Sequence, residues 1–155
     1  MCLRVKELYL NHKTEGKPTK MFKVVVHEML YDYYGRASII YIAPFYPQRY
    51  DVGCVYSEQQ SGGVEKFCYH LTSGFFHGLL DLRDCVDYME ELRVMRPTAV
   101  FDIIECEIPP EANVAVGECY YTGPVYSTAV ASDKLKVTRV VPLKEYVDWT
   151  YKRGE

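Results

Sequence analysis

The sequence predicts an α+β fold: a single domain, residues 1–155, in which a mainly antiparallel β-sheet carries one principal α-helix at about residues 81–94. Three observations predict it. Runs of β-branched and aromatic residues recur along the chain, and glycine, proline and short polar loops separate them. One longer stretch has the periodicity of an amphipathic helix. The length suits one hydrophobic core, and many strands with one helix assemble as an α+β domain.

Each predicted strand is a β-branched or aromatic run that ends at turn-forming residues. These runs are residues 21–30, 37–45, 53–57, 64–71, 99–108, 113–121, 125–132 and 134–143. Gly35 supplies the turn between the first two strands, and Pro44 stops the second. Gly117 lies inside a predicted strand, where a glycine indicates a bulge.

The predicted helix begins near Asp81, which is a suitable N-cap, and Asp84 adds a negative charge to the first turn. Its buried stripe consists of Leu82, Cys85 or Val86, Met89 and Leu92. Acidic residues occupy the other faces, and Pro97 ends the element.

The end of the chain combines a strand with a short tail. Alternation along residues 134–143 predicts one face with Leu135, Val137 and Arg139 and an opposite face with Lys136, Thr138 and Val140. Residues 143–155 are expected to form a short docked helix. In that helix Val147 and Trp149 are the residues expected to pack against the domain.

Charge and cysteine usage exclude several classes of protein. The net charge is −3 and the basic residues form no strong run, so binding to nucleic acid through a broad basic face is not expected. No apolar stretch approaches the length of a membrane span, and the start of the chain does not resemble a secretory signal. The six cysteines are scattered without a zinc-ligand spacing. We therefore expect a cytoplasmic protein with reduced thiols and without a bound metal or cofactor.

Six stretches of the chain occur in an order typical of one group of proteins. They are MCL, FKVV, APFYPQRYDVG, GFFHGLLDLRDCVDYM, ECEIPPEANVAVGE and VASDKLKVTRVV, and they span most of the sequence. They resemble a family of small uncharacterised proteins from bacteria and their phages. The sequence departs from the family pattern at the doubled Phe75 and Phe76, and at Pro110 and Glu111, where a basic residue and a glycine are more usual. The resemblance implies a cytosolic single domain, in the host cytoplasm if phage-encoded, and supplies no reaction.

His77 precedes the predicted helix and is the first candidate for a ligand site. Free backbone N–H groups at a helix N-terminus attract anions, and a histidine beside them could help to grip a phosphate or carboxylate. Gly74 would permit a close approach of the backbone to the ligand. The alternative is a half-buried histidine bonded to a nearby carbonyl.

The second candidate is the aromatic segment PFYPQRY. Its Phe45, Tyr46 and Tyr50 could form a stacking wall for a planar ring, and Arg49 could pair with a phosphate. Two prolines would hold this wall rigid. The alternative is a loop whose tyrosines cover the core. Tyr126 and Ser132 lie in a second region rich in tyrosine and hydroxyl groups, with the same two interpretations.

Catalytic chemistry has weaker signals. Cys68 with His70 or His77 could form a thiol–imidazole pair, but no third orienting residue is evident. Asp102, Glu105 and Glu107 in one strand could serve as acid and base or bind a metal. A solvated strand face explains these carboxylates more simply, so no catalytic residue is assigned.

The sequence therefore favours a non-enzymatic protein that binds a small, nucleotide-like molecule. A phage protein of this kind would sequester a nucleotide immune signal, such as a cyclic nucleotide or an ADP-ribose derivative, and so act against host defence. One alternative is a nucleotide-processing enzyme, since the order of elements loosely resembles that of enzymes that transfer ADP-ribose. It predicts a histidine or cysteine in contact with a carboxylate. The other is a protein-binding inhibitor, which predicts tyrosines on an exposed patch that a homo-oligomer could also use.

Overall fold

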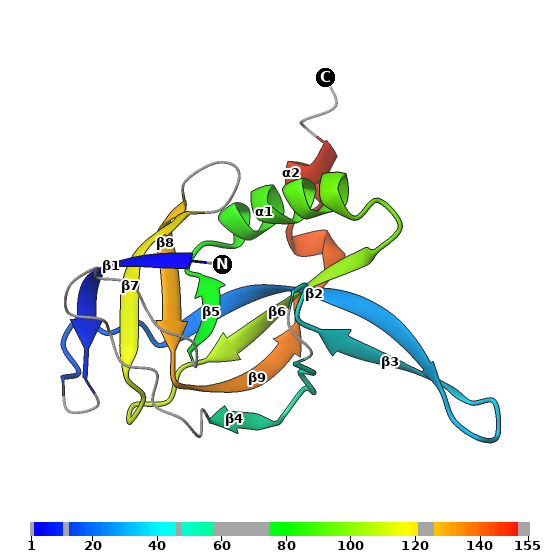
Figure 1. Ribbon diagram of the computed structural model, residues 1–155, viewed down its shortest axis with the longest axis horizontal. Helices are drawn as coiled ribbons and strands as arrows, with labels where there is room; N and C mark the ends of the chain where they lie inside the picture. Colours follow the sequence, from blue (N-terminus) through cyan, green and yellow to red (C-terminus); the bar gives the residue numbers. More distant parts are fainter. Residues whose placement is uncertain (1, 11–12, 46–47, 58–74, 121–125, 152–155) are drawn as a thin grey trace.

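The computed structural model describes residues 2–10, 13–45, 48–57, 75–120 and 126–151. The strands in this part of the chain are β1 Cys2–Tyr9, β2 Lys20–Tyr31, β3 Ala37–Ile42, β4 Val55–Ser57, β5 Phe76–Leu79, β6 Val100–Glu107, β7 Val114–Tyr120, β8 Tyr126–Ser132 and β9 Lys134–Val140. The helices are α1 Leu82–Met95, the 3-10 turn η1 Leu143–Glu145 and α2 Val147–Tyr151. All strand pairs are antiparallel, and α1 packs on the sheet (Figure 1), which confirms the predicted α+β class.

The nine strands form one curved sheet in the order β1-β7-β8-β5-β2-β6-β9-β4, and β3 pairs with β2. Two hydrophobic clusters lie on its two faces. The helix-side core includes Phe22, Val24, Phe101, Ile103 and the buried stripe of α1. The inner core includes Met21, Val25, Tyr50, Phe76, Ile104, Cys106, Leu135 and Val137. Strand β2 contributes to both clusters because its alternate side chains point to opposite faces.

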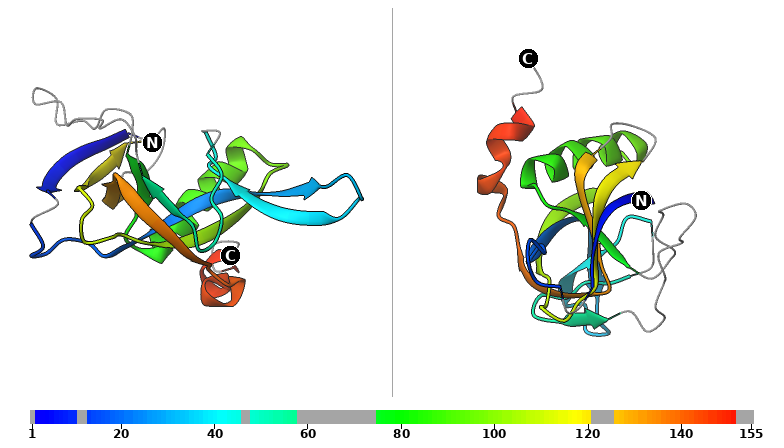
Figure 2. Two further views of the ribbon diagram at one scale, coloured as in Figure 1. Left: turned by 90° about the horizontal axis from the view of Figure 1, so that it is seen from below. Right: turned by 90° about the vertical axis from the view of Figure 1, so that its left-hand side faces the viewer.

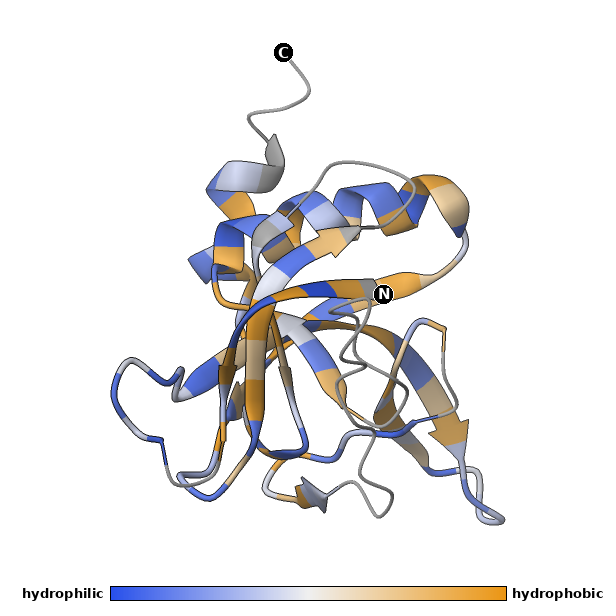
Figure 3. Ribbon diagram, turned by 60° about the vertical axis from the view of Figure 1, so that its left-hand side comes forward, coloured by the Kyte–Doolittle hydropathy of each residue, from blue (hydrophilic) through white to orange (hydrophobic). Residues whose placement is uncertain are grey.

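Helix α1 forms as its sequence predicts. The Asp81 carboxylate accepts a hydrogen bond from the Arg83 backbone N–H at 2.8 Å, which caps the helix. The buried residues are Cys85, Val86, Tyr88, Met89 and Leu92. Tyr88 is an addition to the predicted stripe, and hydrophilic residues alternate with apolar ones along the helix (Figure 3). One face of α1 therefore seals the helix-side core.

Two irregularities shape the sheet. Beside Gly117 the pairing of β7 shifts register with both of its neighbours, so the sheet is irregular at the glycine that was expected to mark a bulge, although the additional residues lie in β8 and β1. A Cβ atom at Gly117 would lie 1.8 Å from the Arg4 carbonyl oxygen, so the strands can approach here only because the residue is glycine.

The second irregularity is in β9, where Glu105 pairs with Arg139 and Cys106 pairs with Val137. Thr138 is therefore an extra residue, and the alternation reverses after it. Val140 packs against the inner core, and Arg139 bonds to Glu105 instead of following Val137. The strict alternation predicted for this strand was wrong beyond Val137, because a bulge shifts every later side chain by one position.

The outer half of the β2–β3 hairpin, residues 28–40, projects beyond the rest of the molecule (Figure 2). We call it the arm. Strand β2 is buried from Met21 to Val26 and exposed from Glu28 onward, so one strand runs from the core into the arm. At the tip, the Asp32 carboxylate accepts hydrogen bonds from the backbone N–H groups of Tyr34 and Arg36, and Gly35 has a φ of 75°.

The arm exposes large apolar side chains. They are Met29, Leu30, Tyr31, Tyr33, Tyr34 and Ile39, and Tyr33 is 97% exposed. The outer part of this hairpin is therefore rich in apolar and aromatic side chains that lie in solvent.

Three further segments can be compared with the predicted elements. The strand β1 was not predicted, whereas the tail forms α2 as expected and packs Trp149 against the helix-side core. The predicted strand at 64–71 lies outside the described residues. Within the part of the chain that the structure describes, no helix has the length and apolarity needed to cross a membrane.

Candidate functional site

Lys23 is a charged residue in the most buried part of the sheet. It lies in β2 between Phe22 and Val24, and only 9% of its surface is exposed. Alternation along the strand directs its side chain toward the inner core, with Met21 and Val25. A lysine at such a position is uncommon, because burial of an ammonium group is costly unless an opposite charge compensates it.

Among the described residues, the Lys23 amine has two contacts on this face. It donates a hydrogen bond to the backbone carbonyl of His77 in β5, and it lies 5.1 Å from the centre of the Tyr50 ring. No carboxylate forms an ion pair with it among the described residues. An ammonium group has three N–H donors, so these two contacts leave part of its bonding capacity unused.

Electrostatics around Lys23 reflect this burial. The pKa of the Lys23 amine falls from 10.5 to about 8, because its surroundings exclude water. Burial raises the pKa of the Cys106 thiol to about 12, and the pKa of the Cys85 thiol also rises well above its ordinary value through burial. Both thiols are therefore neutral near pH 7 and do not compensate the ammonium charge.

Three aromatic rings form a cluster that begins at Tyr50, beside Lys23, and we call this cluster of Tyr50, Tyr56 and Phe76 the aromatic wall. Tyr50, Tyr56 and Phe76 contact one another edge to face, with centroid distances of 5.4 to 6.4 Å. Burial raises the pKa of Tyr50, which stays protonated. The Tyr56 hydroxyl accepts a hydrogen bond from the Asp51 backbone N–H at 2.7 Å, and this bond holds the ring in place. The result is a cation beside flat, rigid rings.

His77 contributes mainly its backbone to this site. It follows Phe76 in β5, so its imidazole points to the face opposite the Phe76 ring. The pKa of the imidazole falls to about 4, through burial first and the Lys23 charge second, so the ring is neutral near pH 7. The carboxylate of Asp81 already caps the N-terminus of α1, which is where His77 was expected to meet an anion.

A second polar pair lies farther along the same face of β2. His27 Nδ1 is 2.6 Å from Asp102 Oδ2, and the Tyr41 ring packs edge-on against the imidazole with centroids 6.0 Å apart. Lys23 and His27 are four residues apart, about 13 Å along the strand. Both side chains of the pair are partly exposed, at 28% for His27 and 24% for Asp102. A carboxylate on Nδ1 orients the ring and leaves Nε2 to meet another group.

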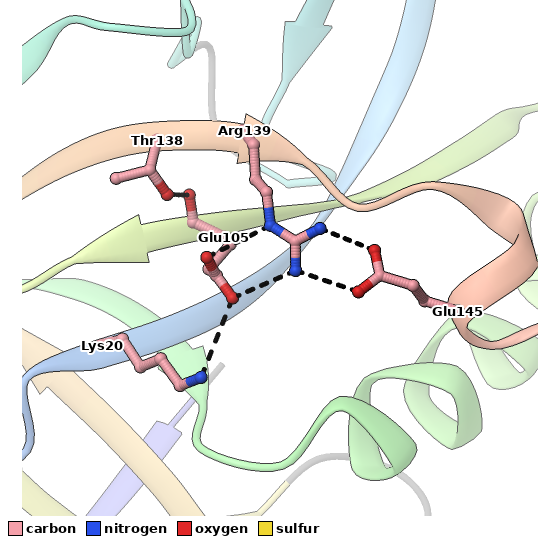
Figure 4. Close-up of polar contacts among 5 residues, drawn as sticks. All are labelled: Lys20, Glu105, Thr138, Arg139 and Glu145. Atoms are coloured by element: carbon pink, nitrogen blue, oxygen red, sulfur yellow. Dashed lines mark hydrogen bonds and ion pairs between the residues drawn. The ribbon is translucent and has the colours of Figure 1, made fainter.

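Glu105, a second carboxylate of β6, has structural partners. Arg139 bonds to Glu105 through its Nε, at 3.2 Å, and to Glu145 through its Nη1, at 2.6 Å (Figure 4). The Lys20 amine nitrogen lies 3.9 Å from Glu105 Oε1. The pKa of Glu145 is lowered by its bonds to Arg139. This network ties η1 to the sheet, and Glu107 is exposed. The described residues contain no cluster of three or more metal-binding side chains.

The structure does not gather all the predicted site residues at one place. Tyr50 and the His77 backbone meet at Lys23. Arg49 is exposed and pairs with Asp51 at 2.8 Å, and Phe45 is also exposed. Tyr46 and Gly74 lie outside the described residues, as do Cys68 and His70.

The two remaining residues lie in or beside β8. The Tyr126 ring is in the helix-side core against Tyr88, with centroids 6.1 Å apart. Ser132 is fully buried, pairs with Phe76 across the strands and donates a hydrogen bond to the Lys134 carbonyl at 2.6 Å. Ser132 therefore lies near the aromatic wall, and Tyr126 lies on the other side of the sheet.

Sequence reasoning missed Lys23, although the sequence carries a signal for it. In MFKVVVHEML a single lysine interrupts a run of apolar residues that reads as a buried strand. The expectation of reduced cysteines agrees with the structure at Cys54, Cys85 and Cys106, which are free thiols. Comparisons with family models, with curated proteins and with solved structures found no match to this chain.

Proposed function

We propose that this protein binds a small, anionic, nucleotide-like molecule without transforming it, and that Lys23 supplies the charge that holds the anion. The observation that carries the proposal is the buried Lys23 amine, which has no carboxylate partner among the described residues. Native proteins pair their buried charges. An uncompensated cation therefore indicates that its counter-charge arrives with a ligand.

The aromatic wall supports a planar ligand. The Tyr50 ring lies beside the amine and contacts Tyr56 and Phe76 edge to face, and rigid groups lose little entropy when they order around a guest. A phosphate on Lys23 and a base near these rings would together account for the tyrosines and the lysine. The resemblance to proteins of bacteria and phages extends the proposal: the ligand would be a nucleotide immune signal that the protein sequesters.

Binding should depend on pH in a defined way. An anion prefers the charged amine, whose pKa in the free protein is about 8. Affinity is therefore constant below this pH and falls as the pH rises through it, by up to about tenfold per pH unit until the pKa of the complex is reached.

The test is calorimetric titration with a panel of cyclic mononucleotides, cyclic dinucleotides and ADP-ribose, followed by heating the complex and chromatography of the released ligand. Intact ligand that binds the wild type, and binds Lys23→Met at least about 100-fold more weakly, is the expected result. Lys136→Met, an exposed lysine in β9, is the matched control. Wild-type affinity for every ligand in Lys23→Met would contradict the proposal.

Arg49→Ala tests the placement that the sequence suggested. If the exposed Arg49 contacts the phosphate, its loss weakens binding, and the ligand lies on the outer side of the aromatic segment. If the ligand sits against Lys23, Arg49→Ala binds as the wild type does. The two variants thus separate two positions for one ligand.

The His27–Asp102 pair favours a second candidate function, a nucleotide-processing enzyme. The enzyme alternative requires a histidine in contact with a carboxylate, and the 2.6 Å contact between these two side chains has this form. The free Nε2 of His27 could take a proton from water or from a ligand hydroxyl. Altered ligand in the chromatography, lost in His27→Gln, would favour this candidate over sequestration.

A further inference from the structure

The outer edge of strand β3 is open along most of its length. On its inner side β3 pairs with β2 throughout. On its outer side, backbone pairing with the described residues occurs only at its end, where Tyr50 N–H donates to the Tyr41 carbonyl at 2.8 Å and Arg49 bridges Ile42. Residues 36–40 therefore present an edge without a paired strand in the described part of the chain.

Two hydrogen bonds fix which backbone groups face outward. The Arg36 carbonyl accepts from Asp32 N–H, so residue 36 faces β2, and the Tyr41 carbonyl accepts from Tyr50, so residue 41 faces outward. Alternation then directs the N–H and C=O groups of Ala37 and Ile39 to the open edge. Four backbone groups are available to another strand.

This edge lacks the protection that natural edge strands usually have. The six residues of β3, Ala37–Ile42, contain neither charge nor proline. The neighbouring side chains Met29, Tyr31 and Ile39 are exposed and apolar. Such an edge favours pairing with a further strand.

A second copy of the same edge fits it in one register. In an antiparallel pair about a two-fold axis, Ser38 would face its own copy and Ala37 would face Ile39 of the other chain. The outward groups of Ala37 and Ile39 then meet and form four hydrogen bonds. This register is centred on residues 36–40, so it avoids Tyr41 and Ile42, which are already engaged.

The same register brings opposite charges together. Arg36 of one chain would lie opposite Ile40 of the other, and Ile40 is paired with Glu28. The separation from Arg36 to that Glu28 is two strand spacings, about 10 Å, which the two long side chains can span. In the single chain, neither Arg36 nor Glu28 forms an ion pair with a described residue.

We propose that the arm is a self-association surface, through which two copies of this chain pair their β3 edges in an antiparallel, two-fold arrangement with Arg36 facing the partner's Glu28. The paired edges would give a continuous sheet across the dimer. Met29 and Ile39 of one chain would continue into Ala37 and Tyr31 of the other, so apolar side chains exposed in the monomer become covered. The proposal is independent of the ligand site at Lys23.

Sedimentation velocity of the full chain over a range of concentrations tests the proposal. The wild type should show a concentration-dependent monomer–dimer equilibrium. Arg36→Glu and Glu28→Arg should each weaken the dimer by about tenfold, because each places like charges together, and the double variant should return to within about threefold of the wild type. Lys144→Glu, the same charge reversal on the exposed turn η1, is the matched control and should have no effect.

Ile39→Lys provides a test that does not depend on the ion pair. Ile39 is exposed, so the substitution leaves the hairpin folded, as circular dichroism can verify, and it should weaken the dimer by at least about tenfold. A weak dimer has a Kd of roughly 0.5 mM, so a wild type that stays monomeric at this concentration overturns the proposal. The apolar arm would then be a candidate surface for binding a different protein. A dimer unaffected by Ile39→Lys and by both charge reversals overturns it as well.

Discussion

The buried body around Lys23 and the projecting arm obey opposite rules, although strand β2 runs through both. In the body, β2 is buried on both faces, and the one charged side chain there has no counter-charge among the described residues. In the arm, the same strand carries large apolar side chains into solvent. Each region departs from the ordinary distribution of charge and hydrophobicity. We propose that each departure is compensated by a binding partner: an anion at Lys23 in the body and a second β3 edge at the arm.

A matched pair of glycine substitutions gives the largest contrast between the two regions. Gly117→Ala would place a Cβ atom 1.8 Å from the Arg4 carbonyl oxygen, so we expect a loss of at least about 3 kcal/mol in unfolding free energy. Gly35→Ala has open space around it and is opposed only by its φ of 75°, which should cost about 1 kcal/mol. Urea unfolding of both variants measures the difference. Equal losses would mean that the body is no more tightly constrained than the arm.

Lys23→Met should stabilise the protein. An amine whose pKa is lowered from 10.5 to about 8 in the folded state costs roughly 3 kcal/mol of stability at pH 7. At Lys23 the unfolded chain binds the extra proton between these two pKa values, so the unfolding free energy of the wild type relative to that of Lys23→Met rises from pH 8 to about pH 10.5. Chemical denaturation across this range should therefore show the stability advantage of Lys23→Met over the wild type and over Lys136→Met shrinking as the pH rises. A destabilised Lys23→Met would show that the amine is a structural element.

The His27–Asp102 pair lies at the boundary between the body and the arm, and we expect a loss of unfolding free energy of intermediate size when the pair is broken. Asp102→Asn keeps the shape of the side chain and removes the charge that faces His27 Nδ1. We expect a loss of about 1 kcal/mol, because both groups are partly exposed. Glu107→Gln, at an exposed position of the same strand, is the control. A loss as large as that of Gly117→Ala would assign the pair to the core.

The smallest effect is expected at the tip of the arm. Tyr33 is 97% exposed, and Tyr33→Ser should change the unfolding free energy by less than about 0.5 kcal/mol. Tyr50→Ala in the body should cost roughly 3 kcal/mol, because it removes a buried ring. Thermal melts of the two variants provide the comparison. A strongly destabilised Tyr33→Ser would mean that the arm's tyrosines serve folding, which would weaken the case for a binding surface.

Local sequence patterns predicted the helix and most strands, because periodicity, the Asp81 cap and the turn glycines act over a few residues. They did not predict the direction of Arg139, which an extra residue in β9 reverses through pairing with a distant strand. Arg49 and Tyr50 are adjacent in the sequence but differ in exposure, because distant strands cover only Tyr50. Of the two, only Tyr50 lies beside Lys23. The site depends on which strands become neighbours, and that information is not local.

The proposed function depends on Lys23 being a buried cation whose counter-charge comes from a bound anion. The most direct measurement is an NMR titration of lysine side chains labelled with ¹³C, with the Lys23 signal assigned from Lys23→Met, in the free protein and with a bound nucleotide. We expect a pKa near 8 for the Lys23 amine in the free protein and a higher pKa when the anion is bound. A pKa near the ordinary value of 10.5, unchanged by every nucleotide, would contradict it.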